Sequence, residues 1–259
     1  MATYLDAILA AHRARAAADT RSLSRLVDQA RAAGAVRDFA AAVGRPGLSV
    51  IAEVKRRSPS KGPLAPGLVP SVLAKDYAAG GAAALSVLTD EAHFGGSAAD
   101  LAEARAAVDL PVLRKDFTVA PADVADARLM GADAVLLIVA ALDDAELRDL
   151  HALAVELGLA ALVEAHDEAE VERALAAGAR LVGVNQRDLV TFAVDTDRAV
   201  RVARVIPDDV VSVAESGITG AHDAARLAAA GFDAILVGEH LVTSGDPAAS
   251  LSRLVAPCS

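Results

Sequence analysis

The sequence predicts an α/β fold, and within that class a (β/α)8 barrel preceded by a helical N-terminal extension. The chain has 259 residues, of which 54% are hydrophobic, and this length suits one barrel of roughly 250 residues. Eight short apolar runs follow one another, separated by Ala-rich helical stretches. Polar residues do not alternate with apolar ones inside the runs, so both faces of each strand should be buried, as in parallel strands covered by helices. We expect a single domain over residues 1–259.

Residues 1–47 are predicted to form the helical extension, and residues 48–259 the barrel. Tyr4 and Ile8 begin one apolar pattern at helical spacing, and Leu26 belongs to a second one. Thr20 or Ser22 is suited to cap the second helix, because a hydroxyl oxygen can accept a hydrogen bond from a free backbone N–H. Glycine and proline in segment 44–47 then mark the end of the extension.

The predicted strands come next, and each intervening helix ends in a glycine signal. Gly131, Gly178 and Gly231 each precede a run, as expected of helix C-caps that lead into short loops. Eight strands within residues 48–259 favour a closed barrel, with a doubly wound open sheet as the alternative. The runs cover residues 48–54, 83–88, 111–113, 134–139, 160–163, 181–184, 210–214 and 234–237.

Composition argues against several functional classes. The formal net charge is −10, whereas nucleic-acid binders usually carry a basic surface. The longest strongly apolar run, residues 134–142, is too short to span a bilayer. Asp6, His12 and Arg13 interrupt any apolar core of a leader peptide, so we expect a cytoplasmic protein. We expect no nucleic-acid or membrane partner.

Motifs for metals, nucleotides and nucleophilic hydrolysis are missing. The six histidines are scattered and no pair has the spacing of a metal-binding motif. The chain has no GxSxG elbow, no P-loop and no GxGxxG after the first predicted strand. We therefore expect neither a metal nor a cofactor.

Polar side chains follow most of the predicted strands directly. The carboxyl ends of the strands of a parallel barrel meet at one rim, where the active sites of such barrels lie. Charges that abut apolar strands are costly unless they are paired or solvated in a site. In chain order, the residues are Glu53 and Lys55, Lys115, Glu164, Asn185, Glu215 with Ser216 and Gly217, and Gly238 with Glu239.

Four of these groups suit acid–base chemistry. Lys55, Lys115, Glu53 and Glu164 would form a cup of two cations and two anions. Such groups perturb one another's pKa values and suit proton transfer on an anionic substrate. The alternative is a set of rim salt bridges that only closes the barrel.

Glycines after the last two strands suggest a phosphate site. Ser216–Gly217 and Gly238–Glu239 each precede a helical stretch. Backbone N–H groups at such helix starts can bind a dianion, and many barrels hold phosphate at this corner. Ordinary strand-to-helix turns would give the same residues.

Two further loop features remain open. Phe94 and Phe117 are scarce aromatics in rim loops, where they could contact an aromatic ring of the substrate or simply pack the loops. The basic run over residues 55–61 could contact nucleic acid, but serine and proline interrupt it and the chain is acidic. A substrate-facing loop is the better interpretation.

Eight segments carry a combined pattern: 51–55, 58–62, 86–90 with Phe94, 111–117, 163–164, 184–185 with Arg187 and Leu189, 215–218, and 236–239. In combination, these segments resemble the indole-3-glycerol phosphate synthase family. The similarity runs in order along the whole chain, including the extension. Three departures stand out: Arg57 replaces a small residue, Gln186 and Asp188 replace asparagines, and segment 118–123 lacks a tyrosine.

The resemblance implies closure of an indole ring with loss of carbon dioxide and water, from 1-(2-carboxyphenylamino)-1-deoxyribulose 5-phosphate. It implies that Lys115 is the general acid and that Lys55 holds the substrate carboxylate. It implies that Glu164 serves as acid and base, with Glu53 and Asn185 as orienting groups. Ser216 completes the catalytic set. The residues implied in substrate binding are Ser58, Arg57, Phe94, Phe117, Arg187, Leu189, Glu215, Gly217, Gly238 and Glu239.

The implied partner is a small anionic sugar phosphate, and the implied state is a monomer or weak dimer. One alternative is another phosphate-binding barrel enzyme of tryptophan biosynthesis. Phosphoribosylanthranilate isomerase would need a cysteine in its site, whereas the only cysteine here is Cys258 in the tail. The α-subunit of tryptophan synthase would leave Lys55 and Lys115 unexplained. A non-catalytic binding barrel predicts rim charges that pair only with each other.

Overall fold

The computed structural model describes residues 4–58, 61–188 and 190–255. Eight parallel strands form a closed barrel in the order β1-β10-β9-β8-β7-β6-β5-β4. Because β1 pairs with both β4 and β10, the sheet has no open edge and the doubly wound alternative is excluded. The strands are β1 (Ser49–Val54), β4 (Ala84–Leu88), β5 (Val112–Lys115), β6 (Ala134–Ile138), β7 (Ala160–Ala165), β8 (Leu181–Asn185), β9 (Val211–Glu215) and β10 (Ala234–Val237).

Four strands, β5, β7, β8 and β9, reach further toward their carboxyl ends than the apolar runs predict. Lys115, Asn185 and Glu215 each end a strand, and Glu164 lies inside β7. The predicted site residues are therefore held by the barrel ladder itself, which is more rigid than a loop. In the opposite sense, β6 ends at Ile138 because Val139–Ala141 forms a 3-10 turn.

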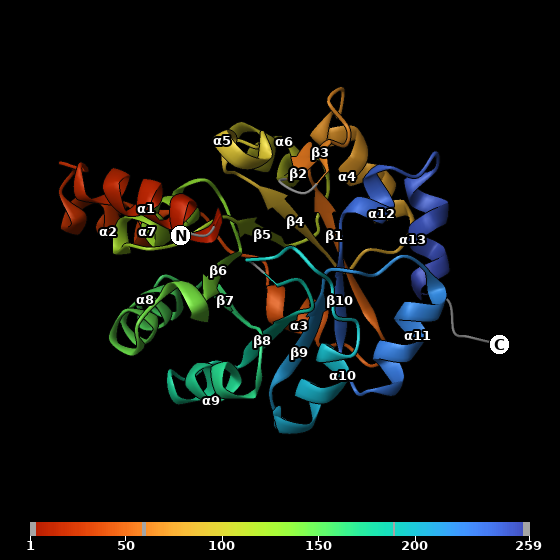
Figure 1. The fold of residues 1–259 in the computed structure, drawn as a ribbon. Coiled ribbons are helices and arrows are strands. Elements are labelled where there is room, and N and C mark those ends of the chain that lie inside the picture. The colour runs from red at the N-terminus through yellow and green to blue at the C-terminus, as the bar shows by residue number, and fades with distance from the viewer. Residues whose placement is uncertain (1–3, 59–60, 189, 256–259) are drawn as a thin grey trace.

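Helices surround the strands on the outside of the barrel, as Figure 1 shows. Gly131, Gly178 and Gly231 have φ of +89°, +96° and +96°, the left-handed conformation expected of helix C-caps. A short hairpin, β2 (Arg57–Ser58) and β3 (Gly62–Pro63), projects from the loop after β1. The helices are α4 (Pro70–Ala79), α5 (Glu91–Phe94), α6 (Ala98–Ala107), α7 (Pro121–Leu129), α8 (Asp144–Glu156), α9 (Glu168–Ala176), α10 (Arg198–Val202), α11 (Ala221–Ala229), α12 (Glu239–Val242) and α13 (Pro247–Val255).

The N-terminal extension contains three helices, α1 (Tyr4–Ala17), α2 (Leu23–Ala32) and α3 (Phe39–Val43). The side chain of Ser22 caps α2, as predicted for one of two candidates. Helices α1 and α2 lie against the outside of the barrel beside α7 (Figure 1). None of the helices in the described ranges is long and apolar enough to cross a membrane.

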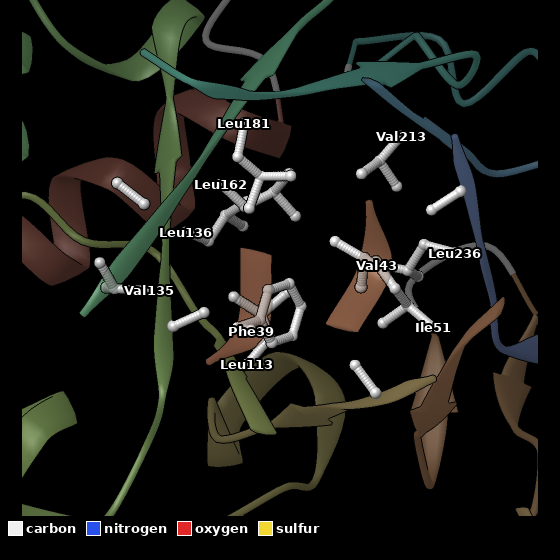
Figure 2. Packing of buried hydrophobic residues seen from close by; sticks show 14 of the residues in the cluster. Phe39, Val43, Ile51, Leu113, Val135, Leu136, Leu162, Leu181, Val213 and Leu236 are labelled. Atoms are coloured by element: carbon white, nitrogen blue, oxygen red, sulfur yellow. The ribbon is translucent and has the colours of Figure 1, made fainter. Parts of the chain in front are cut away.

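Helix α3 closes the end of the barrel at which the strands begin. Phe39 and Val43 are fully buried in the main apolar cluster, and Figure 2 shows them among the strand side chains. A Cβ on Gly44, the residue after α3, would meet the side chain of Val211 at the start of β9 at 3.0 Å. The carboxyl end of the barrel stays free for the site.

Candidate active site

A cavity of about 600 Å³ lies at the carboxyl ends of the strands. Its volume suits a small metabolite that is mostly enclosed. Among the described residues, every residue predicted for the site lines it except Arg57. Those that do are Glu53, Lys55, Ser58, Phe94, Lys115, Phe117, Glu164, Asn185, Arg187, Glu215, Ser216, Gly217, Gly238 and Glu239.

Lys115 lies at the centre of the polar cluster. Its Nζ donates to Oε2 of Glu164 at 2.9 Å and to Oε2 of Glu215 at 2.6 Å. All three side chains are mostly buried. Burial alone would lower the pKa of the Lys115 ammonium, but the two carboxylates, with Glu53 beyond them, raise it above its ordinary value. Lys115 is therefore a proton donor that holds its proton in the resting site.

Glu164 and Glu215 share this ammonium but differ in charge state. Burial acts to raise the pKa of Glu164, but Lys115, the ring of His166 and a hydrogen bond from Asn185 lower it below its ordinary range. Burial raises the pKa of Glu215 to about 7, against the opposing effect of Lys115. Among the described residues, Oε1 of Glu215 has no hydrogen-bond partner. Glu164 is thus the ionised carboxylate at neutral pH.

Lys55, the second lysine of the predicted cup, pairs with Glu53. Lys55 Nζ forms an ion pair with Oε2 of Glu53. Gly238 makes room for this carboxylate, since a Cβ there would come within 2.2 Å of Oε2 of Glu53. Gly183 in β8 does the same for Glu215, whose Oε1 would lie 2.2 Å from an added Cβ. Gly238 therefore has a packing role that the sequence did not indicate.

Asn185 connects the carboxylates to the rim. Its Nδ2 donates to Oε1 of Glu164 at 3.1 Å, and its Oδ1 accepts from the backbone N–H of Arg187 at 3.0 Å. The guanidinium of Arg187 donates to the carbonyl of Phe192 at 3.1 Å. Arg187 thereby supports the loop after β8 while its side chain lines the cavity.

The corner formed by β9 and β10 has an unusual backbone. Ser216 and Gly217 have φ of +69° and +72°, and positive φ is uncommon for a residue other than glycine. Gln186 holds this turn, since its Nε2 donates to the carbonyl of Ser216 at 2.7 Å. Lys61 lines the same cavity and forms an ion pair with Glu239. Lys61 was not predicted as a site residue.

A sequence profile of the indole-3-glycerol phosphate synthase family matches residues 5–254. The chain belongs to the indole-3-glycerol phosphate synthase family. The synthase of a Nocardioides species is 62% identical over 208 residues, which cover 80% of each chain. The synthase of Streptomyces griseus is 54% identical over 235 residues, or 91% of this chain and 87% of the relative. The chain is thus a carbon–carbon carboxy-lyase of tryptophan biosynthesis.

Solved structures with low identity agree on the fold alone. The thiamine phosphate pyrophosphorylase of Pyrococcus furiosus superposes with a TM-score of 0.61 at 18% identity, over 80% of this chain and 93% of the other. A 3-hexulose-6-phosphate synthase superposes with a TM-score of 0.64 at 15% identity, over 80% and 98%. These matches therefore show that the chain shares the closed-barrel fold with them.

In this synthase, aromatic side chains connect the rim to the N-terminal extension. The ring of Phe117 lies 5.4 Å from that of His12 in α1, between centroids. Phe192, which also lines the cavity, packs edge-on against Tyr4 at 5.3 Å. Phe94 lines the cavity from α5. The extension therefore contacts two loops of the site.

One predicted substrate-binding residue, Arg57, is not brought to the cavity. Arg57 is exposed and its side chain runs past Gly95, whereas Ser58, the next residue of β2, is buried and faces the cavity. Adjacent strand residues point to opposite sides, so Arg57 and Ser58 cannot both face inward. Leu189, in the loop after β8, lies outside the described residues, as do residues 59–60 in the loop after β1.

Within the described ranges, one cluster has the composition of a metal site. Ligand atoms of His12, Asp90 and His93 lie within 4.8 Å of one another. His12 Nε2 and His93 Nδ1 each contact Oδ2 of Asp90 at 2.9 Å, and His12 Nδ1 contacts Arg15 at 2.9 Å. These hydrogen bonds account for the cluster without an ion. Sequence spacing could not reveal it, because His12 and Asp90 are 78 residues apart.

Proposed function

We propose that Lys115 is the general acid of the indole-3-glycerol phosphate synthase reaction in this chain. The observation that supports this role is the position of its Nζ, 2.9 Å from Glu164 and 2.6 Å from Glu215 at the base of the cavity. An ammonium that holds its proton at rest can deliver it to the ketone oxygen as negative charge develops there during ring closure. The proton goes from Nζ to this oxygen, and the new bond joins the ring carbon to the former ketone carbon.

Lys55 would hold the substrate carboxylate in the same site. Its present partner is Glu53, and a substrate carboxylate can compete for the same ammonium. Orientation of this group matters because the bond to carbon dioxide must align with the iminium formed on ring closure. The iminium accepts the electron pair of the broken bond, so the decarboxylation requires no cofactor. Lys55 would also donate a proton during the later loss of water.

Glu164 would act as the base and stabilise positive charge on the anilinium-like nitrogen. Its ionised state at neutral pH fits a proton acceptor. Asn185 and Glu53 would orient the reacting groups and bind substrate hydroxyls. Glu215 would accept a hydrogen bond from the Lys115 ammonium beside the substrate.

The phosphate would bind at the corner of β9 and β10. Backbone N–H groups of Ser216, Gly217, Gly238 and Glu239 would contact its oxygens. Phe94 and Phe117, which follow β4 and β5 at the same rim, would pack on the anthranilate ring. The aromatic end and the phosphate end of the substrate would thus contact different residues of the cavity lining.

The remaining assignments concern the whole chain. We propose that the extension and barrel work as a single domain, because α1 reaches the rim through Tyr4 and His12. We propose a cytoplasmic enzyme that acts as a monomer or weak dimer on a free anionic sugar phosphate.

The experiment is a fluorescence assay for indole-3-glycerol phosphate with Lys115→Ala. The chain lacks Trp, so the indole product is seen on a low background. We expect wild-type turnover in the presence of EDTA and a loss of about 10²- to 10⁴-fold in kcat for the variant, the range of general acid catalysis. Substrate binding should remain measurable by equilibrium titration.

The matched control is Lys75→Ala, which removes an exposed lysine on α4. It should retain wild-type kcat. Near-normal turnover of Lys115→Ala would refute the role of Lys115. A folded wild-type protein without turnover, but with affinity for the substrate, would favour a binding barrel.

A further inference from the structure

His166 lies beside Glu164 and outside the lining of the cavity. It follows β7 directly, its side chain is 13% exposed, and it does not line the cavity. Nδ1 of the ring contacts Oε2 of Glu170 in α9 at 3.0 Å, and the backbone N–H of His166 donates to the same oxygen at 2.8 Å. The orientation of the ring is therefore fixed by one carboxylate.

The other ring nitrogen faces the active site. Among the described residues, Nε2 of His166 is buried and has no hydrogen-bond partner. The carboxylate oxygen Oε1 of Glu164 lies 3.7 Å away, just beyond hydrogen-bond distance. Asn185 uses one lone pair of this oxygen, which leaves a second one for His166. A small shift would complete a chain from Glu170 through His166 to Glu164.

Three charged groups face the ring. Burial lowers the pKa of His166, but the hydrogen bond to Glu170 and the charges of Glu164 and Glu170 raise it above its ordinary value overall, against the opposing charge of Arg198 in α10. Ionisation of both carboxylates therefore favours the protonated form of the ring. A doubly protonated ring has two donors, and Nδ1–H is taken by Glu170.

We infer that His166 is a positioning residue that keeps Glu164 ionised and directed at Lys115. The inference rests on the role proposed above for Glu164. Lys115 and His166 are the two cations next to Glu164 that lower its pKa. When Lys115 transfers its proton to the substrate, one of these charges disappears. His166 then stabilises the carboxylate that must accept the next proton.

A purely structural role makes a different prediction. If His166 only joins β7 to α9 through Glu170, its loss should lower stability and leave the pH dependence of turnover unchanged. If it controls the charge of Glu164, its loss should raise the pKa of Glu164. The acidic limb of the kcat profile is the pH range in which kcat falls because Glu164 becomes protonated. This limb would then move to higher pH.

The test compares His166→Asn and His166→Gln with the wild type. An asparagine amide can keep the bond to Glu170 and removes the group at Nε2, whereas a glutamine amide keeps a donor near Nε2 without the charge. For His166→Asn we expect kcat to fall by about 10- to 100-fold, as for other residues that orient a reacting group, with KM changed by less than about threefold. We expect the acidic limb of both variants to move up by about one pH unit. The matched control is His151→Asn on α8, beside Gly178, which should change neither kcat nor the limb.

Two further variants separate the possible outcomes. Glu170→Gln leaves both ring and Glu164 in place, and should move the limb in the same direction even if His166→Asn fails to fold. In a Glu164→Gln background, His166→Asn should change the residual rate by less than about twofold, because the group through which it acts is gone. An unchanged acidic limb in the His166 and Glu170 variants would overturn the inference. Near-normal turnover of Glu164→Gln would instead refute the role of Glu164.

Discussion

Glu164 and Glu215 show how identical functional groups acquire different charge states. Both contact the same ammonium through Oε2 and both side chains are 2% exposed. Glu164 also receives a hydrogen bond from Asn185 and faces His166. Oε1 of Glu215 has no such support in the described structure. The number of compensating groups, rather than the depth of burial, decides which carboxylate carries the charge.

Replacing Glu215 with Gln should change how stability depends on pH. The pKa of Glu215 rises from 4.5 to about 7 on folding. Between these values the folded chain binds more protons than the unfolded chain, so the free energy of unfolding decreases as pH rises from about 4.5 to about 7. This loss amounts to at most about 3 kcal/mol, and Glu215→Gln should remove it. Urea unfolding at pH 5 and pH 8 measures the difference.

The control for this experiment is Glu168→Gln, which alters an exposed glutamate on α9. It should show the same decrease with pH as the wild type. Glu164 does not interfere, because its pKa is lowered and its contribution is lost only in more acidic solution. An undiminished decrease in Glu215→Gln would assign the pH dependence to other groups.

The sequence predicted which residues line the cavity better than it predicted which side chains contact one another. Lys115, Glu164 and Glu215 could be predicted because parallel strands bring their carboxyl ends to one rim. The attachment of Lys115 to Glu215 across 100 residues, and the orphaned nitrogen of His166, depend on side-chain directions that strand patterns do not specify. Arg57 was predicted among the substrate-binding residues because a two-residue strand, in which neighbours face opposite ways, was not recognised.

At the scale of elements, α1 is attached to the barrel by a polar contact inside an apolar interface. His12 is 3% exposed and lies between Arg15 of the same helix and Asp90, the residue that precedes α5. Asp90 also caps α5 through the backbone N–H of His93. The burial of His12 strengthens its hydrogen bond to Asp90, because water competes little for this bond.

Substitution of His12 by Asn should loosen α1 more than the rest of the molecule. The change leaves Asp90 with a buried oxygen that has lost one donor, at a cost of about 1–3 kcal/mol. Hydrogen exchange over residues 4–17 should accelerate, while exchange of the barrel strands stays slow. The control His222→Asn alters an almost fully exposed side chain on α11. Equal acceleration in the strands would indicate global rather than local destabilisation.

Strand positions were predictable and helix contacts were not. Each predicted apolar run overlaps a barrel strand and differs from it by at most two residues at either end, because burial on both faces leaves a clear signal. The short helix α3 falls within the predicted extension, but nothing in its five residues, Phe39–Val43, indicates that it closes the barrel. Its position depends on contacts distant in sequence, such as that of Gly44 with Val211.

At the scale of the whole molecule, helix α3 and the candidate site lie at opposite ends of one barrel. Phe39→Ala empties a buried site in α3, so we expect a loss of about 3–5 kcal/mol in the free energy of unfolding. The kcat per folded molecule should stay unchanged. Denaturant unfolding together with the indole assay below the unfolding transition tests both statements.

Phe94→Ala is the reciprocal variant, because Phe94 is only partly buried and lines the cavity. It should raise KM by removing contact with the substrate ring, and change stability by less than about 1 kcal/mol. A loss of kcat in Phe39→Ala comparable to its loss of stability would show that the two ends are coupled.

The two glycines beneath the carboxylates determine what it would take to transplant this chemistry. A barrel that received Glu53, Lys115, Glu164 and Glu215 alone would carry the four charged side chains without the space that two of them occupy beside Gly183 and Gly238. At the positions of Gly183 and Gly238, any side chain would intrude to 2.2 Å of a carboxylate oxygen. Grafting the site onto another scaffold would therefore require glycine at both positions as well as the charged residues. A search for distant relatives of this site should likewise require both glycines.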